Sequence, residues 1–179
     1  MSAIKMKLGL YISMTHAESP LLEQAMENIQ TVLEETKNLS YQMVIPQFGP
    51  GFFESYIQQM LTDYISVHRK VSSHFENFVD EKIPTQIKET LYRIAQEQLV
   101  NIEKHAAASH ITITIKGFEK TVSMEIKDDG IGFDMAEKNK GIGLDNIQHR
   151  AESYGGTVSV TSSPGNGCVL KVDMPLDQM

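Results

Sequence analysis

The spacing of apolar residues predicts two regions along the chain. From residue 2 to 46, apolar side chains recur every three or four positions, which is the period of a helix. Ser19 and Pro20 supply an N-cap and a first-turn proline between two helical segments, and Pro46 ends the second. Residues 1–46 are therefore predicted to form a helical hairpin. Its apolar stripe has little else in the chain to pack against, so we expect a homodimer through residues 2–45.

From residue 50 to 179, helical periods alternate with runs of β-branched residues, and strands predominate toward the end. We expect helices at 52–69, 84–105 and 143–154, and strands at 71–79, 111–116, 121–127, 157–162 and 168–174. This order predicts an α/β (α+β) two-layer sandwich, with helices on one face of a mixed sheet. A hairpin at 1–46 is thus expected to precede a second domain at 50–179.

Composition narrows the classes of function. The net charge is −7 and no cluster of lysine and arginine stands out, so direct binding of nucleic acid is not expected. The single cysteine, Cys168, excludes an internal disulfide and lies among aliphatic residues, which predicts a buried structural thiol. No apolar run is long enough to span a bilayer and no convincing cleavage site follows the N-terminus, so we expect this segment to be cytoplasmic.

Two glycine-containing segments carry the clearest chemical signal. Asp128-Asp129-Gly130-Ile131-Gly132 follows a β-branched run, so it lies at the end of a strand. Gly141-Ile142-Gly143-Leu144 opens an amphipathic segment, so it lies at the start of a helix. A glycine turn there leaves backbone N–H groups unpaired, and the helix dipole favours an anion. Either segment alone is as readily an ordinary turn, but the two in this order indicate a nucleotide site.

The long helix expected at 84–105 carries a polar face. Glu97 and Asn101 lie one turn apart on this face, and Lys104 and His105 follow them. An amide and a carboxylate at this spacing suit Mg²⁺, although the carboxylate is equally suited to hold or polarise a water. Taken alone, this face is more simply a solvated helix surface. Another face is expected to point to the core and carries Ala95, Leu99, Ile102 and Ala106.

Together these segments resemble the ATP-binding domain of sensor histidine kinases, the GHKL or Bergerat fold shared with gyrase, Hsp90 and MutL proteins. The matching motifs are Glu97-x-x-x-Asn101-x-x-Lys104-His105, Asp128-x-Gly130-x-Gly132 and Gly141-x-Gly143-Leu144. They occur in the family's order and spacing, and the resemblance covers residues 50–176. The stretches 91–97 and 141–150 are similar to the branch that partners response regulators with helix-turn-helix output domains. The short segment 134–140 fits the abbreviated ATP lid of that branch.

The resemblance implies roles for the polar helix face. Asn101 would bind Mg²⁺, and Glu97 would be the acid/base or water-orienting group. Lys104 and His105 would lie near the phosphates of ATP. Phosphoryl transfer depends mainly on positioning and on neutralising spread negative charge, so these residue types suit the reaction.

The resemblance also implies roles for the glycine segments. Asp128 would accept a hydrogen bond from the adenine amino group, with Gly130 and Gly132 letting backbone and base approach closely. The hinge of the lid and the phosphate cradle would be formed by Gly141, Gly143 and the backbone before Leu144. Cys168 stands where the family usually has threonine, and we expect this departure to affect packing or a water near adenine while activity is kept.

A histidine kinase also needs an acceptor histidine, followed by an acidic residue, on the first helix of its hairpin. His16 precedes Ala17 and lies near the end of that helix, and the remaining five histidines fall outside the hairpin. Residues 2–8 look like the half of the helix downstream of the acceptor, so we expect the chain to begin just past it. The chain is then expected to bind Mg-ATP without phosphorylating itself, with a response regulator as its partner and a parent protein that is in some cases membrane-anchored.

Three other interpretations stay open. A GHKL serine kinase of the anti-sigma-factor type lacks the helical hairpin, so residues 2–45 argue against it. A nucleotide-sensing or dimerising module without transfer activity would describe the isolated segment well. An ATPase like gyrase or MutL is less favoured, because those proteins have a longer lid and further domains.

Overall fold

The structure is a computed structural model and describes residues 52–136 and 142–177. The chain divides into two units, Met1–Ile45 and Pro46–Met179. The first unit lies outside the described residues, so the helical hairpin, its role in dimerisation and the position of His16 stay predictions. Gly141 and most of the predicted lid also lie outside the described residues.

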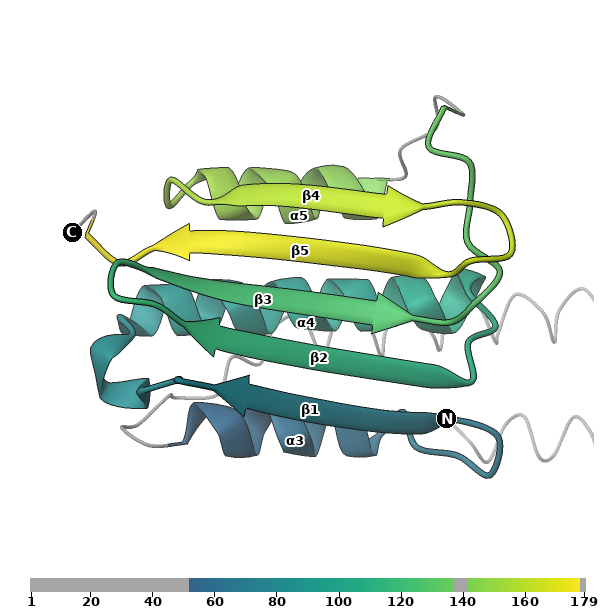
Figure 1. Cartoon of the computed structure of the whole chain (residues 1–179), viewed down its shortest axis with the longest axis horizontal. Coiled ribbons are helices and arrows are strands. Elements are labelled where there is room, and N and C mark those ends of the chain that lie inside the picture. Colours follow the sequence, from purple (N-terminus) through teal and green to yellow (C-terminus); the bar gives the residue numbers. More distant parts are fainter. Residues whose placement is uncertain (1–51, 137–141, 178–179) are drawn as a thin grey trace, which may run out of the picture. The chain divides into compact units, whose positions relative to one another are not determined.

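One mixed sheet of five strands forms the second unit, in the order β1-β2-β3-β5-β4 (Figure 1). Strands β1 and β2 are parallel, and the other neighbouring strands are antiparallel. The strands are β1 (Lys70–Glu76), β2 (His110–Gly117), β3 (Thr121–Asp128), β4 (Thr157–Ser162) and β5 (Cys168–Pro175). The predicted mixed sheet is confirmed, and the first strand ends three residues earlier than expected.

Helices cover one face of the sheet, as Figure 1 shows for α3, α4 and α5 behind the strands. They are α3 (Phe53–Thr62), α4 (Thr85–His105) and α5 (Ile142–Glu152), and a short 3-10 turn at Asp80–Lys82 precedes α4. The predicted two-layer α/β sandwich is therefore confirmed. The layers position the site because α4 and α5 pack side by side on this face, α4 against β3 and α5 against β4.

The expected helix at 52–69 is wrong in its second half, because α3 ends at Thr62. Ser66 and Arg69 exchange backbone hydrogen bonds of 3.2 Å in both directions and form a tight turn instead. Ile65 is 59% exposed and Val67 is 96% exposed, so no core is available to receive a continued helical stripe. The helical spacing of apolar residues continues past Thr62 in the sequence, but these residues have no buried surface to pack against, so the helix stops.

Alternation along the strands separates a core face from a polar face. Ile111, Ile113 and Ile115 of β2 are buried against the helices, while Thr112 and Thr114 between them are only partly covered. The core face of α4 is confirmed for Ala95, Leu99 and Ile102, which are all buried, and Ala106 is partly buried. Within the described part of the chain, no helix has the length and apolar character needed to cross a bilayer.

Cys168 begins β5 and is buried, as expected for a structural thiol. Burial, together with the nearby charge of Asp128, raises the pKa of the thiol to about 11. At neutral pH the group is therefore a protonated thiol that packs beside the end of β3.

Candidate functional site

The polar face of α4 lies where the sequence predicted it. Glu97 and Asn101 are half-buried in the C-terminal half of the helix, and Lys104 and His105 are exposed in its last turn. The helix ends at His105, and the N–H of its C-cap residue, Ala106, donates to the carbonyl of Ile102. Along two turns toward the C-terminus of α4, this face therefore passes from the half-buried side chains of Glu97 and Asn101 to the exposed groups of Lys104 and His105.

Gly143 in the first turn of α5 lies directly against this face. A methyl group in place of one of its Cα hydrogens would lie 2.8 Å from Glu97 Oε1 and 2.9 Å from Asn101 Oδ1. Any side chain at this position would therefore displace both polar groups. The glycine lets α5 begin against the two residues that the sequence singled out on α4.

The same two residues supply a donor set that fits a hard cation. Glu97 Oε1 and Asn101 Oδ1 both approach one point beside Gly143, and carboxylate and amide oxygens are ligands that Mg²⁺ accepts. Among residues 52–136 and 142–177, no group of three or more His, Cys, Asp or Glu side chains is arranged to hold a metal. Two protein oxygens leave the other positions of an octahedral Mg²⁺ to further ligands.

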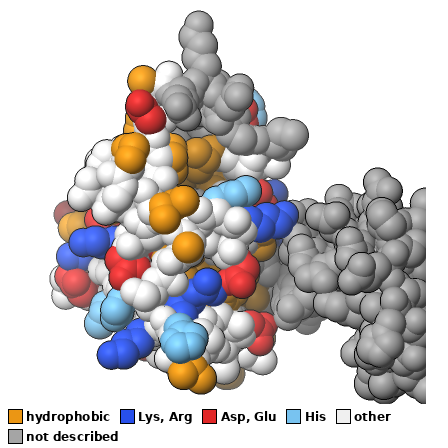
Figure 2. All heavy atoms as spheres, turned by 90° about the vertical axis from the view of Figure 1, so that its right-hand side faces the viewer, with side chains coloured by type: hydrophobic (Ala, Val, Ile, Leu, Met, Phe, Trp, Pro, Cys, Tyr) orange, Lys and Arg blue, Asp and Glu red, His pale blue; other side chains and the backbone are white. Residues whose placement is uncertain are grey.

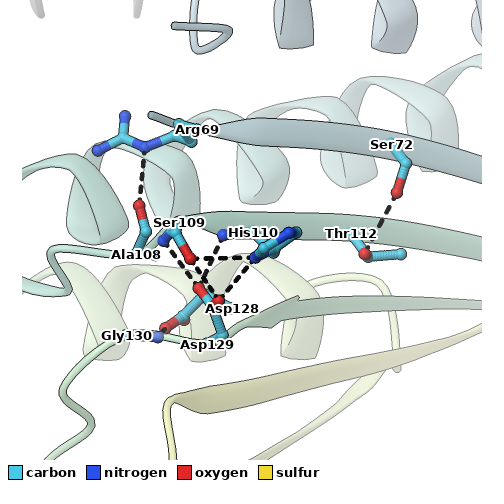
Figure 3. Close-up of polar contacts among 9 residues, drawn as sticks. All are labelled: Arg69, Ser72, Ala108, Ser109, His110, Thr112, Asp128, Asp129 and Gly130. Carbon is cyan, nitrogen blue, oxygen red and sulfur yellow. Dashed lines mark hydrogen bonds and ion pairs between the residues drawn. The ribbon is translucent and has the colours of Figure 1, made fainter. Parts of the chain in front are cut away.

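Asp128 ends β3 on the buried side of the sheet and is only 2% exposed. Its Oδ1 accepts a hydrogen bond of 2.9 Å from the N–H of Gly130 (Figure 3). Burial raises the pKa of Asp128, although backbone hydrogen bonds from Gly130 and Cys168 oppose this effect. A buried carboxylate of this kind is stabilised by any further donor that reaches it.

Glycines let the loop after Asp128 pass close to neighbouring backbone. A methyl group on Gly130 would lie 2.2 Å from the carbonyl oxygen of Ala106 at the end of α4. Gly132 has a φ of 61°, and a methyl group there would lie 2.1 Å from the carbonyl oxygen of Ser163. The loop at 128–132 is therefore held between the end of α4 and the turn that joins β4 to β5.

The remaining predicted site residues are Lys104, His105, Leu144 and Gly141. Lys104 and His105 point to solvent, and Figure 2, which faces the end of the sheet where β3 finishes, shows charged and histidine side chains among exposed apolar ones. Leu144 is half-buried and packs against the core. Gly141 lies outside the described residues.

Sequence reasoning gave no role to Asp129, whose carboxylate is the most heavily hydrogen-bonded side chain of this region. It accepts bonds from the backbone N–H groups of Ser109 and His110 at 2.8 and 2.7 Å, and it contacts both of their side chains (Figure 3). Partial burial would raise the pKa of Asp129, but the hydrogen bonds from Ser109 and His110 together hold it far below its ordinary value. The signal in the sequence was the doubled aspartate, since alternation along β3 turns only Asp128 toward the core.

The family of the chain follows from comparison with known proteins. Residues 86–178, more than half of the chain, match the model of the histidine kinase-, DNA gyrase B- and HSP90-like ATPases. The match begins in the first turn of α4 and includes β2 through β5, so it contains every described residue of the candidate site.

Curated relatives are sensor kinases. The oxygen sensor histidine kinase NreB of Staphylococcus carnosus is 28% identical over 81% of this chain and 42% of its own length. The signal transduction histidine-protein kinase/phosphatase DegS of Bacillus subtilis is 33% identical over 60% of this chain and 30% of its own. The sensor protein VraS of Staphylococcus haemolyticus is 27% identical over 93% and 49%. The chain thus spans less than half the length of these relatives.

Solved structures share the fold. The histidine kinase domain of the Erythrobacter litoralis EL346 blue-light activated histidine kinase has a TM-score of 0.60 at 15% identity, covering 98% of this chain and 84% of that one. The ATP binding domain of PrrB from Mycobacterium tuberculosis has a TM-score of 0.52 at 21% identity, covering 68% and 91%. The mixed sheet, the glycine-lined loop and the matched family model lead to one conclusion: the chain belongs to the histidine kinase-, DNA gyrase B- and HSP90-like ATPase family and carries the ATP-binding catalytic domain of the histidine kinase type.

Proposed function

We propose that this chain is the ATP-binding catalytic part of a two-component sensor histidine kinase. It transfers the γ-phosphoryl group of ATP to a histidine, from which the group passes to a response regulator. The observation that carries the proposal is the approach of Gly143 to Glu97 and Asn101, on a helix whose end contacts the loop of Asp128. This arrangement gives one site with a buried acceptor at one side and oxygen ligands at the other.

The buried carboxylate of Asp128 recognises the adenine amino group. The amino group donates a hydrogen bond to Asp128, and burial makes the loss of that bond costly for a base without the donor. Gly130 and Gly132 leave space for the flat base because neither carries a side chain. This half of the site therefore supplies selectivity for adenine.

The polar face of α4 acts on the phosphates. Asn101 would hold Mg²⁺, which would neutralise charge on the phosphates when bound, and Lys104 adds a second cation at the exposed end of the face. Glu97 accepts the proton that the acceptor histidine loses as its ring nitrogen attacks the γ-phosphorus. The bond from that phosphorus to the bridging oxygen breaks, and ADP leaves with the electron pair.

The partner is a response regulator, and we infer one with a helix-turn-helix output domain from the branch that the motifs resemble. The acceptor histidine lies on a segment other than the residues described here. His68, His74 and His149 are exposed on a turn, a strand and α5, and His110 contacts Asp129. Two copies pair through residues 2–45.

Calorimetric titration with ATP tests the two halves of the site separately. Asp128→Asn and Asn101→Ala should each weaken binding of Mg-ATP by at least about tenfold, or about 1.4 kcal/mol. The loss in Asn101→Ala should disappear when a chelator removes Mg²⁺, whereas the loss in Asp128→Asn should remain. His149→Ala, at an exposed position of α5, is the control and should bind as the parent does. Unchanged affinity in both site variants would sink the assignment.

A second test concerns the acceptor. Incubation of this chain with ATP labelled at the γ-phosphate should leave no acid-labile phosphate on it, while the same chain with an acceptor-containing hairpin supplied should transfer label. Acid-labile phosphohistidine on this chain alone would contradict the inferred place of the acceptor.

A further inference from the structure

The turn between α4 and β2, residues 106–109, is held by contacts from several sides. The N–H of Lys70 donates to the carbonyl of Ser109 at 2.8 Å, and Arg69 Nε donates to the carbonyl of Ala108 at 3.2 Å. The guanidinium of Arg69 also forms an ion pair with Glu103 on α4. These contacts join the start of β1 to the turn, so the turn lies between the first strand and the loop that follows β3.

Ala107 shows that this turn is not in a relaxed conformation. Its φ is 48°, which is the left-handed region that residues with a Cβ avoid. Such a conformation persists where neighbouring contacts hold it in place. The contacts made to the residues after Ala107 are therefore part of what keeps α4 ending where it does.

The carboxylate of Asp129 supplies the densest of these contacts. Its Oδ1 accepts from the backbone N–H groups of Ser109 and His110 at 2.8 and 2.7 Å. Its Oδ2 lies 2.7 Å from Ser109 Oγ, which donates to it, and 2.8 Å from His110 Nδ1 (Figure 3). We call these contacts between Asp129, Ser109 and His110 the Asp129 clasp.

The clasp is continuous with the backbone that presents Asp128. The N–H of Asp129 donates to the carbonyl of His110 at 3.3 Å, and the N–H of Ile131 donates to the carbonyl of Ala106 at 2.8 Å. Between these two bonds the N–H of Gly130 donates to Asp128 Oδ1. Loop 128–131 is thus attached to the start of β2 at Asp129 and to the end of α4 at Ile131, with the carboxylate of Asp128 turned inward and that of Asp129 turned outward.

We propose that Asp129 is a positioning residue for nucleotide binding: through the clasp it holds the end of α4 against the loop of Asp128, so that the buried carboxylate and the polar face of α4 keep one geometry. This inference rests on the proposed function, because the group that Asp129 positions is the adenine-binding carboxylate. Asp129 itself makes its contacts away from the buried side of β3 and does not touch the nucleotide.

Affinity for ATP tests the proposal. Asp129→Ala removes all four contacts and should weaken binding about tenfold, which is about 1.4 kcal/mol. Asp129→Asn keeps an oxygen that accepts from both backbone N–H groups, so it should recover most of the lost affinity. Asp173→Ala is the matched control, because its side chain is 40% exposed against 42% for Asp129 and it lies toward the other end of the sheet. That variant should bind ATP as the parent does.

A double-mutant cycle separates positioning from a general loss of stability. If Asp129 acts through Asp128, then Asp129→Ala should cost less than about twofold in affinity when Asp128→Asn is already present, because coupled residues are non-additive. An equal loss in both backgrounds would overturn the proposal. So would equal binding by Asp129→Ala and the parent, or no recovery in Asp129→Asn.

Amide hydrogen exchange without nucleotide distinguishes failure of this inference from failure of the proposed function. The amide of Gly130 reports the position of the Asp128 carboxylate to which it donates, and the amides of Ser109 and His110 report the clasp. In Asp129→Ala all three should exchange faster, whereas Asp173→Ala should leave them unchanged. If the parent binds no ATP, the proposed function is wrong. The exchange rate of the Gly130 amide then decides by itself whether Asp129 positions the loop of Asp128. Unchanged exchange there in Asp129→Ala would refute it.

Discussion

The two ends of the proposed nucleotide site are held in different ways. At the adenine end, defined by residues 128–132, backbone lies against backbone and glycines make the approach possible. At the phosphate end, defined by Glu97, Asn101, Lys104 and Gly143, side chains would carry the chemistry, and those of Glu97 and Asn101 lie against Gly143. We therefore expect the adenine end to be formed before a ligand binds and the phosphate end to be completed by the ligand.

This difference has a physical basis. A base is recognised by one hydrogen bond and by shape, so its site gains from rigid backbone and from a buried acceptor such as Asp128. The negative charge of phosphates is neutralised by cationic side chains such as Lys104 and by a metal ion such as Mg²⁺. The positions of these cations are set only when the nucleotide binds. Changes at the adenine end should therefore affect stability as well as affinity, and changes at the phosphate end should affect affinity alone.

The largest effect is expected at Gly132. Gly132→Ala combines a left-handed backbone with a methyl group 2.1 Å from the carbonyl oxygen of Ser163, so it should lower the free energy of unfolding by about 2–5 kcal/mol. Gly165→Ala is the matched control, because it has a φ of 79° but nothing lies within 4 Å of the added carbon. That variant should lose only about 1–2 kcal/mol. Urea denaturation measures both, and equal losses would show that crowding at the adenine end has no effect.

A smaller effect on stability, but a clear one on binding, is expected at Gly143. Its added methyl group would meet the ends of the Glu97 and Asn101 side chains, which can move, and alanine is the better helix former by about 1 kcal/mol. Gly143→Ala should therefore fold as stably as the parent yet bind Mg-ATP about tenfold more weakly. Gln148→Ala in the same helix controls for changes in helix propensity. A large loss of stability in Gly143→Ala would remove the contrast between the two ends.

The smallest effect is a pH dependence with opposite signs at two adjacent residues. The pKa of Asp129 is lowered, so its contribution to stability is present above its ordinary value of 3.8 and is lost as pH falls toward the lowered value. The pKa of Asp128 is raised, so its contribution is largest below 3.8 and is lost as pH rises through the raised value. Melting temperatures of Asp129→Asn and Asp128→Asn, compared with the parent from neutral pH to below 3.8, should therefore deviate in opposite directions. Parallel deviations would mean that the two carboxylates share one environment.

Local patterns in the sequence were enough for the sheet and for two of the helices. β-branched runs with period two predicted the strands because each has one face in the core, as β2 has in Ile111, Ile113 and Ile115. The helix expected to reach Arg69 ends at Thr62 instead. Apolar residues at helical spacing stabilise a helix only where their side chains pack in a core. Ile65 and Val67 lie at solvent, so the chain turns back through Ser66 and Arg69 instead.

The sequence also indicated which segments meet at the candidate site: Gly143 lies against Glu97 and Asn101, and Gly130 lies against the end of α4. It did not determine what Asp129, the second of the two adjacent aspartates, holds. That was decided by the tertiary structure. The end of β3 turns Asp128 inward, and the backbone N–H groups of Ser109 and His110, 20 and 19 residues earlier in the chain, come within hydrogen-bonding distance of Asp129 only when β2 and β3 pair.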